Sequence, residues 1–125
     1  MILIWIAIGG GIGSVLRYLL YTSVDQLHST ALPLGILTTN IIGSFLMGAL
    51  AWFFTHYAGV AQEYRAAILV GLLGGFTTFS TFSNDTLQHV ISGAYVTALL
   101  NIVLSVVLCI IAAGAGLLLA KSLLT

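Results

Sequence analysis

The sequence predicts an all-α membrane protein with four transmembrane helices. Two observations lead to this fold class. Of the 125 residues, 60% are hydrophobic and only 5% are charged, whereas soluble domains average about 25% charged residues. The few charges also leave four apolar segments, each near the roughly 20 residues that a spanning helix needs. A water-exposed surface cannot be built from this composition.

The four expected spans cover about residues 2–21, 34–55, 65–89 and 95–120. The first span is rich in glycine, and Pro33 marks the start of the second, because its missing N–H is tolerated in the first turn of a helix. The third is longer than one bilayer crossing, and its centre, residues 71–83, is poor in helix-forming residues. We find no internal repeat or linker in the sequence and expect a single domain over residues 1–125.

Composition also argues against several functions. The formal net charge of zero gives no electrostatic footprint for nucleic acid. The single cysteine, Cys109, excludes a disulfide within the chain, and the three histidines lack the spacing of a metal site. No constellation of nucleophile and base, paired carboxylates or phosphate-binding loop is recognisable, so we expect that the protein is not an enzyme.

The basic residues give only a weak signal for membrane orientation. With four spans, Arg65 and Lys121 fall on the side of the N-terminus and Arg17 lies near the other side. Lys and Arg in short loops set orientation, and this imbalance is small. We therefore expect that the chain inserts in both orientations and pairs with its own inverted copy, since inverted symmetry is a recurring architecture for transport.

The centre of the third span predicts a break in the helix. Gly74, Gly75 and several hydroxyl residues would lie at membrane depth, where non-helical backbone survives only if it is buried in protein or lines a watery cavity. A break would free carbonyls such as those of Gly74 and Thr77, which could coordinate a monovalent cation like sodium. The alternative is a face of small residues for close helix packing. The residues alone leave both interpretations open.

Three phenylalanines, Phe76, Phe79 and Phe82, recur every third residue in the same stretch. Packing is the commoner role for such aromatics. The functional interpretation uses the positive edge of the aromatic ring, which could replace water around a small anion. A pore needs such weak binding, because the ion must also be released.

Two amides, Asn40 and Asn101, are expected inside the membrane. Asn101, Ser105 and Cys109 are spaced by four and so share one helix face. Polar groups at this depth serve either hydrogen bonds between helices or a transport pathway, and both interpretations stay open. Arg17 has two interpretations as well: snorkelling to the interface, or an electropositive vestibule that concentrates anions.

At this point the sequence resembles the Fluc (CrcB) family of fluoride channels. The resemblance is carried by three strings, GGGIGSVLRY at 9–18, GILTTNIIGSF at 35–45 and GGFTTFSTFS at 74–83. It extends over essentially the whole chain. The last string is highly specific, whereas each glycine-rich string alone is a weak signal.

The resemblance implies a dual-topology antiparallel homodimer in the cell inner membrane, with two pores that passively export fluoride. It also implies a sodium ion at the dimer centre, held by the backbone carbonyls of Gly74 and Thr77. Arg17 corresponds to an arginine near the vestibule. The pore residues implied by the resemblance are Asn40, Phe79, Thr81, Phe82, Asn101 and Ser105.

The sequence departs from the family pattern at a few positions. Some members have Tyr at the position of Asn101, many have Thr at the position of Ile36, and Ser can occur at that of Cys109. The third-span string is unaffected. We therefore expect ion flux to survive, with shifted stopping points for the anion.

Two other functions compete with this one. A small proton-coupled multidrug antiporter would share the size and the dual topology, but it needs a carboxylate in the first span, and residues 2–21 contain none. A subunit that only assembles with others would explain the glycines and leave the buried amides and hydroxyls without a role.

Overall fold

The computed structural model describes residues 1–57 and 59–124, which form helices and connections without a β-strand. Four segments are long and apolar enough to cross a membrane, namely Ile2–Leu27, Leu34–His56, Gln62–Ile91 and Tyr95–Leu124. This confirms the all-helical class with four spans, and each helix runs past its expected span at one end or both. The chain is a multi-pass membrane protein.

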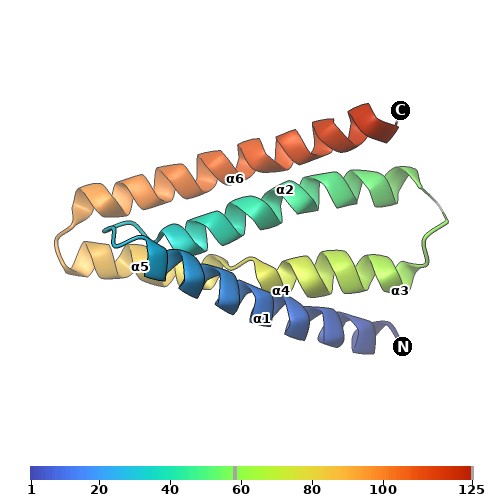
Figure 1. Ribbon diagram of the computed structural model, residues 1–125, viewed down its shortest axis with the longest axis horizontal. Coiled ribbons are helices and arrows are strands. Elements are labelled where there is room, and N and C mark those ends of the chain that lie inside the picture. Colours follow the sequence, from blue (N-terminus) through green and yellow to red (C-terminus); the bar gives the residue numbers. More distant parts are fainter. Residues whose placement is uncertain (58, 125) are drawn as a thin grey trace.

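Three of the spans are single helices: α1 (Ile2–Leu27), α2 (Leu34–His56) and α6 (Tyr95–Leu124). The third is divided into α3 (Gln62–Arg65), the π-helix η1 (Ala66–Leu73), α4 (Gly74–Phe76) and α5 (Phe79–Ile91). Successive spans run in opposite directions, so the N-terminus and the end of α6 lie at the same end of the bundle (Figure 1). The 26 residues of α1 are about 39 Å long, which exceeds the ~30 Å of hydrocarbon in a bilayer.

The first half of the third span packs directly on the backbone of α1. A Cβ added at Gly9 would collide with the carbonyl oxygen of Ala67, and one added at Gly13 would collide with that of Leu72. Small residues permit such close approach between membrane helices. Gly9 and Gly13 therefore serve packing against η1.

The pair α2 and α6 is packed in the same way. A Cβ at Gly48 would collide with the carbonyl oxygen of Ala113, and a Cβ at Gly116 with that of Phe45. Figure 1 shows the two helices side by side along their length. The outer face of α6 is apolar and suits contact with lipid, with exposed side chains that include Val96, Leu99, Val103, Val107, Ile110, Ile111 and Leu118.

Candidate functional site

The third span is interrupted at two threonines. α4 ends at Phe76 and α5 begins at Phe79, and between them Thr77 (φ −88°, ψ 155°) and Thr78 (φ −149°, ψ 124°) are extended. Extended backbone at membrane depth needs hydrogen-bond partners from outside its own helix. The surrounding spans supply them.

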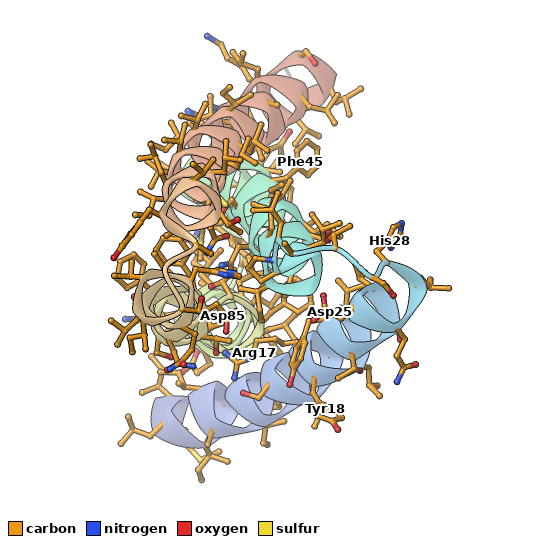
Figure 2. All side chains as sticks on the ribbon, turned by 90° about the vertical axis from the view of Figure 1, so that its left-hand side faces the viewer. Arg17, Tyr18, Asp25, His28, Phe45 and Asp85 are labelled. Carbon is orange, nitrogen blue, oxygen red and sulfur yellow. The ribbon has the colours of Figure 1, made fainter. Side chains whose placement is uncertain are left out.

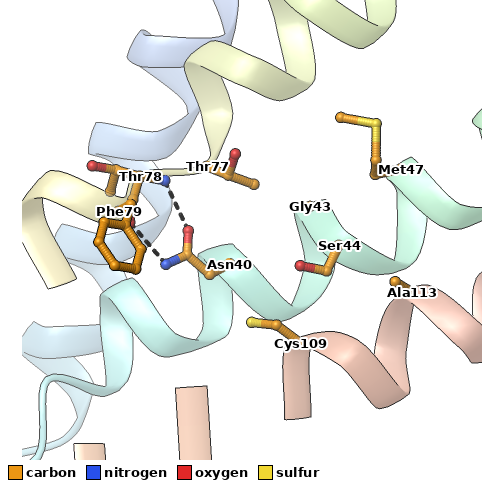
Figure 3. A pocket seen from close by; sticks show the side chains of 9 residues that line it. All are labelled: Asn40, Gly43, Ser44, Met47, Thr77, Thr78, Phe79, Cys109 and Ala113. Atoms are coloured by element: carbon orange, nitrogen blue, oxygen red, sulfur yellow. Dashed lines mark hydrogen bonds between the residues drawn. The ribbon is translucent and has the colours of Figure 1, made fainter. Parts of the chain in front are cut away.

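The peptide groups of Thr78 are paired with the side chain of Asn40 on α2. The Asn40 amide nitrogen Nδ2 donates to the Thr78 carbonyl oxygen at 3.0 Å, and the Thr78 N–H donates to Asn40 Oδ1 at 2.9 Å (Figure 3). The side-chain amide of Asn40 thus makes the two hydrogen bonds that a neighbouring backbone strand would otherwise make with Thr78. After this pairing Asn40 keeps one N–H, and its side chain lines a cavity. The hydrogen-bonding interpretation of Asn40 therefore holds without excluding a place on a pathway.

Arg17 on α1 reaches the same break. Its Nη1 donates to the Thr77 carbonyl oxygen at 3.3 Å, and Figure 2 shows the side chain turned from α1 toward the bundle. This contact differs from snorkelling to the interface. It also means that the Thr77 carbonyl, expected to be freed by the break, has a partner already. One lone pair of this oxygen remains.

Thr78 also begins α5. Its hydroxyl Oγ1 accepts from the Thr81 N–H at 3.2 Å and donates to Thr81 Oγ1 at 3.3 Å, and Ser80 Oγ lies 3.1 Å away. Threonine is a favoured N-cap residue because its oxygen satisfies one of the unpaired N–H groups of the first turn. This places the hydroxyl of Thr81 in the first turn of α5, where the helix dipole is positive.

The break separates the three phenylalanines. Phe76 ends α4 and is buried in an apolar cavity with leucines. Phe79 and Phe82 lie on α5, with ring centroids 5.2 Å apart and planes tilted by 52°. Phe82 is 8% exposed, whereas Phe79 is 75% exposed. The regular spacing in the sequence therefore splits into one packing residue and an aromatic pair.

Two open grooves meet at Phe79. One of about 290 Å³ is shown in Figure 3 and is lined by Asn40, Gly43, Ser44, Met47, Thr77, Thr78, Phe79, Cys109 and Ala113. The other, of about 460 Å³, is lined by Phe79, Phe82, Ser83, Thr86, Leu87, Val90, Ile102 and Val106. The exposed ring of Phe79 therefore borders both grooves.

The polar residues of α6 do not form one continuous track. Asn101 and Ser105 are buried at 2% and 8% exposure, and Ser105 Oγ donates to Asn101 Oδ1 at 3.5 Å. Asn101 Nδ2 donates to Thr86 Oγ1 on α5 at 2.9 Å. Cys109 lines the groove beside Asn40 instead. Asn101 therefore joins two helices, as one of its two interpretations held.

Two residues with structural roles here carried no prediction from the sequence. Thr86 receives the Asn101 amide, and Asp25 Oδ1 accepts from the Gly35 N–H at 2.8 Å, which caps the start of α2. A signal for Thr86 existed. Thr86 and Asn101 lie at nearly equal distances along the chain from the turn at Gly93 (φ 78°), so an antiparallel pair of helices brings them to one level.

Gly74 and Thr77 lie at the end of the first half of the third span. Gly74 is exposed, and a Cβ added there would meet only Leu69 O at 3.9 Å, while Thr77 is half-buried. Carbonyl oxygens at a broken membrane helix suit a sodium ion. The two oxygens of one chain would be a partial set of ligands.

These features define a class of protein: a multi-pass membrane protein whose broken span presents aromatic, amide and hydroxyl groups at bilayer depth, as channels and transporters do. Comparison with known sequences gives the family. The chain belongs to the family described as "CrcB-like protein, Camphor Resistance (CrcB)", which it matches over residues 4–117. The resemblance found in the sequence is thereby confirmed.

The relatives that carry the name "Fluoride-specific ion channel FluC" include the following three. The one from Magnetococcus marinus is 48% identical, with 90% of this chain and 92% of the relative covered. The one from Shewanella woodyi is 49% identical over 86% of each. The one from Citrifermentans bemidjiense is 40% identical, with 97% of this chain and 98% of the relative covered.

Proposed function

We propose that this protein is a fluoride-selective ion channel of the cell inner membrane, which exports F⁻ passively and lowers cytoplasmic fluoride. The observation that carries the proposal is its 48% identity to a protein named a fluoride-specific ion channel, over 90% of this chain. The name of the relatives, that of an ion channel, agrees with the expectation that the protein is not an enzyme.

The proposed pathway follows the start of α5. It uses Asn40, Phe79, Thr81, Phe82, Asn101 and Ser105. The first turn of α5 carries the partial positive charge of a helix N-terminus, and the edges of Phe79 and Phe82 are weakly positive. Asn40 offers its remaining N–H beside Phe79. Such weak attractions hold a small anion without trapping it.

Arg17 is the proposed source of positive potential for the vestibule. Its guanidinium lies against Thr77 at the break, and a fixed cation in a low-dielectric cleft raises the local concentration of anions. The Arg17 guanidinium donates to a neutral carbonyl, which does not cancel its positive charge as a carboxylate would. It can therefore attract fluoride from water.

The proposed working unit is an antiparallel homodimer with two pores. Both grooves beside Phe79 are open on a single chain, and Phe79 is 75% exposed. An inverted second copy would close the grooves, so that each pathway draws on both chains. The weak bias of Arg17 against Arg65 and Lys121 favours insertion in both orientations.

A sodium ion at the centre of this dimer is part of the proposal. Gly74 and Thr77 of two copies would supply four carbonyl oxygens, and sodium would neutralise the negative ends of two half-helices. A ligand that binds only the folded state raises stability. We expect sodium to raise the melting temperature of the purified protein, and an equal melting temperature in sodium and in N-methylglucamine would refute the site.

The antiporter alternative is not supported by the relatives. α1 reaches Leu27 and so includes one carboxylate, Asp25. This side chain accepts from the Gly35 N–H at the start of α2. It therefore has a structural role at the end of the span, whereas an antiporter needs a proton-binding carboxylate within the bilayer.

Purified protein in liposomes tests the proposed function. Liposomes loaded with fluoride are diluted into fluoride-free buffer, and potassium with its ionophore balances the charge while an electrode records the anion. We expect rapid fluoride efflux that needs the ionophore, and no efflux from matched liposomes loaded with chloride. Absence of fluoride efflux, or equal efflux of chloride, would contradict the proposal.

A further inference from the structure

We propose that Thr86 is a positioning residue, which fixes the turn of α5 that carries Phe82 through a directed chain of hydrogen bonds from α6. The inference rests on the proposed function for its effect on flux. The geometry itself is independent of the ion. Its links are four polar groups on two helices.

The donors and acceptors of the chain run in one direction. Ser105 Oγ donates to Asn101 Oδ1 at 3.5 Å, and Asn101 Nδ2 donates to Thr86 Oγ1 at 2.9 Å. Thr86 Oγ1 then donates to the Phe82 carbonyl oxygen at 2.8 Å. Each hydroxyl gives its one proton forward, and hydrogen bonds in such a chain polarise one another.

The Thr86 hydroxyl is the link that connects the Asn101 amide of α6 to the backbone of α5. A threonine that bonds the carbonyl four residues earlier changes the local geometry of its own helix. Here the same oxygen also accepts from Asn101, which holds it in place against α6. The carbonyl of Phe82 is thereby tied, through one oxygen atom, to a residue that is 2% exposed.

The groove beside Phe82 is lined mostly by apolar side chains such as Leu87, Val90, Ile102 and Val106, which give α5 no directional contact with α6. Its polar residue besides Thr86 is Ser83, whose hydroxyl donates to the Phe79 carbonyl of the same helix. Phe82 is 8% exposed and Phe79 is 75% exposed. The chain of hydrogen bonds therefore fixes the position of the buried Phe82 ring. Through the contact between the two rings it also fixes the tilt of the exposed Phe79 ring.

The test uses Thr86→Val, which removes the hydroxyl at constant shape, and Thr86→Ser, which keeps it. Thr39→Val is the matched control, because the hydroxyl of buried Thr39 bonds only the Gly35 carbonyl of its own helix. In liposomes we expect Thr86→Val to lower fluoride efflux about tenfold per assembled protein. Thr86→Ser and Thr39→Val should stay within twofold of the wild type.

A double variant separates positioning from direct contact with the ion. If Asn101 acts through Thr86, Asn101→Ala should lower efflux by a similar factor, and Thr86→Val with Asn101→Ala should lose no more than the larger single loss. Losses that multiply would overturn the proposal, because Thr86 and Asn101 would then act independently of each other. Should Thr86→Val fail to assemble, Ser105→Ala is measured in the same way, with an expected loss of about twofold.

A readout on the ring itself does not depend on fluoride flux. With 4-fluorophenylalanine at position 82, the ¹⁹F resonance should broaden or split in Thr86→Val and return to its wild-type form in Thr86→Ser. An unchanged resonance in Thr86→Val would overturn the proposal even where flux falls. A changed resonance in a protein without any fluoride flux would uphold the positioning role and refute the proposed function.

Discussion

The two halves of the third span are held in different ways. The first half, Gln62–Phe76, lies against α1 with backbone on backbone, at positions such as Gly13 where a Cβ would collide with a carbonyl oxygen. The second half, α5, is held by side-chain hydrogen bonds, from Asn40 at its start and from Asn101 further along. The first half is held by glycines that let two backbones touch, and the second half is held by polar side chains.

The difference assigns a task to each half. Backbone contact holds the first half closely against α1, and the carbonyls of Gly74 and Thr77 at its end are the groups proposed for the sodium ion. Hydrogen bonds from α2 and α6 position α5 and leave the exposed ring of Phe79 free at the border of two grooves. The first half is therefore the scaffold, and the second half carries the proposed pathway.

Removing an aromatic ring from α5 should have the largest effect on flux. We expect Phe82→Ile, and likewise Phe79→Ile, to abolish fluoride efflux from liposomes, a loss of at least about a hundredfold, which corresponds to about 2.7 kcal/mol. The assembled protein should persist in size-exclusion chromatography. The control is Phe53→Ile, because Phe53 lies on α2 far from the break in the third span. Normal efflux from Phe82→Ile would refute the role of the rings.

Adding one methyl group to the scaffold should cost stability. Gly13→Ala places a Cβ against the carbonyl oxygen of Leu72 and the N–H of Phe76, whereas Gly11→Ala meets nothing within 4 Å. Overpacking of this kind costs about 1–3 kcal/mol, and we expect Gly13→Ala to lower the unfolding midpoint in denaturing detergent. Equal midpoints for the two variants would contradict the close packing of the first half on α1.

Loss of the Asn40 amide should loosen the break itself. Asn40→Ala leaves the Thr78 N–H without a partner, which costs about 1–3 kcal/mol for a buried group. It also removes one donor from the Thr78 carbonyl, which as the N-cap carbonyl still accepts within α5. We expect about a tenfold lower fluoride efflux and faster hydrogen exchange at the Thr78 amide. Exchange at the wild-type rate would show that Asn40 does not hold the break.

Removal of the Arg17 charge should have the smallest effect. Arg17→Gln can still donate to the Thr77 carbonyl but adds no positive potential, so we expect about threefold lower efflux at low ionic strength. The difference from the wild type should shrink near 1 M salt, where the Debye length is about 3 Å. Arg17→Lys keeps the charge and serves as the control, and a loss that is independent of salt would refute the electrostatic role.

The sequence was informative where a single segment decides the structure. The spacing of six charges predicted four spans, and the glycines and hydroxyls of residues 71–83 predicted the break. The hydrogen-bond partners of the break could not be predicted. The contact between Asn40 and Thr78 depends on how α2 and the third span are aligned along their axes, and the sequence of one segment does not give this alignment. The π-helical turns of η1 were not predicted either, because the sequence of Ala66–Leu73 is typical of an ordinary apolar α-helix.

The central claim is that fluoride crosses this protein as the charged anion F⁻, uncoupled from protons. Current recorded across a planar bilayer that contains the purified protein tests it most directly. With a tenfold gradient of fluoride and equal chloride on both sides, the reversal potential should shift by about 59 mV, the value for a single charge at 25 °C. A gradient of chloride should leave it unmoved. Absence of current, or a reversal potential that follows chloride or pH, would contradict the account.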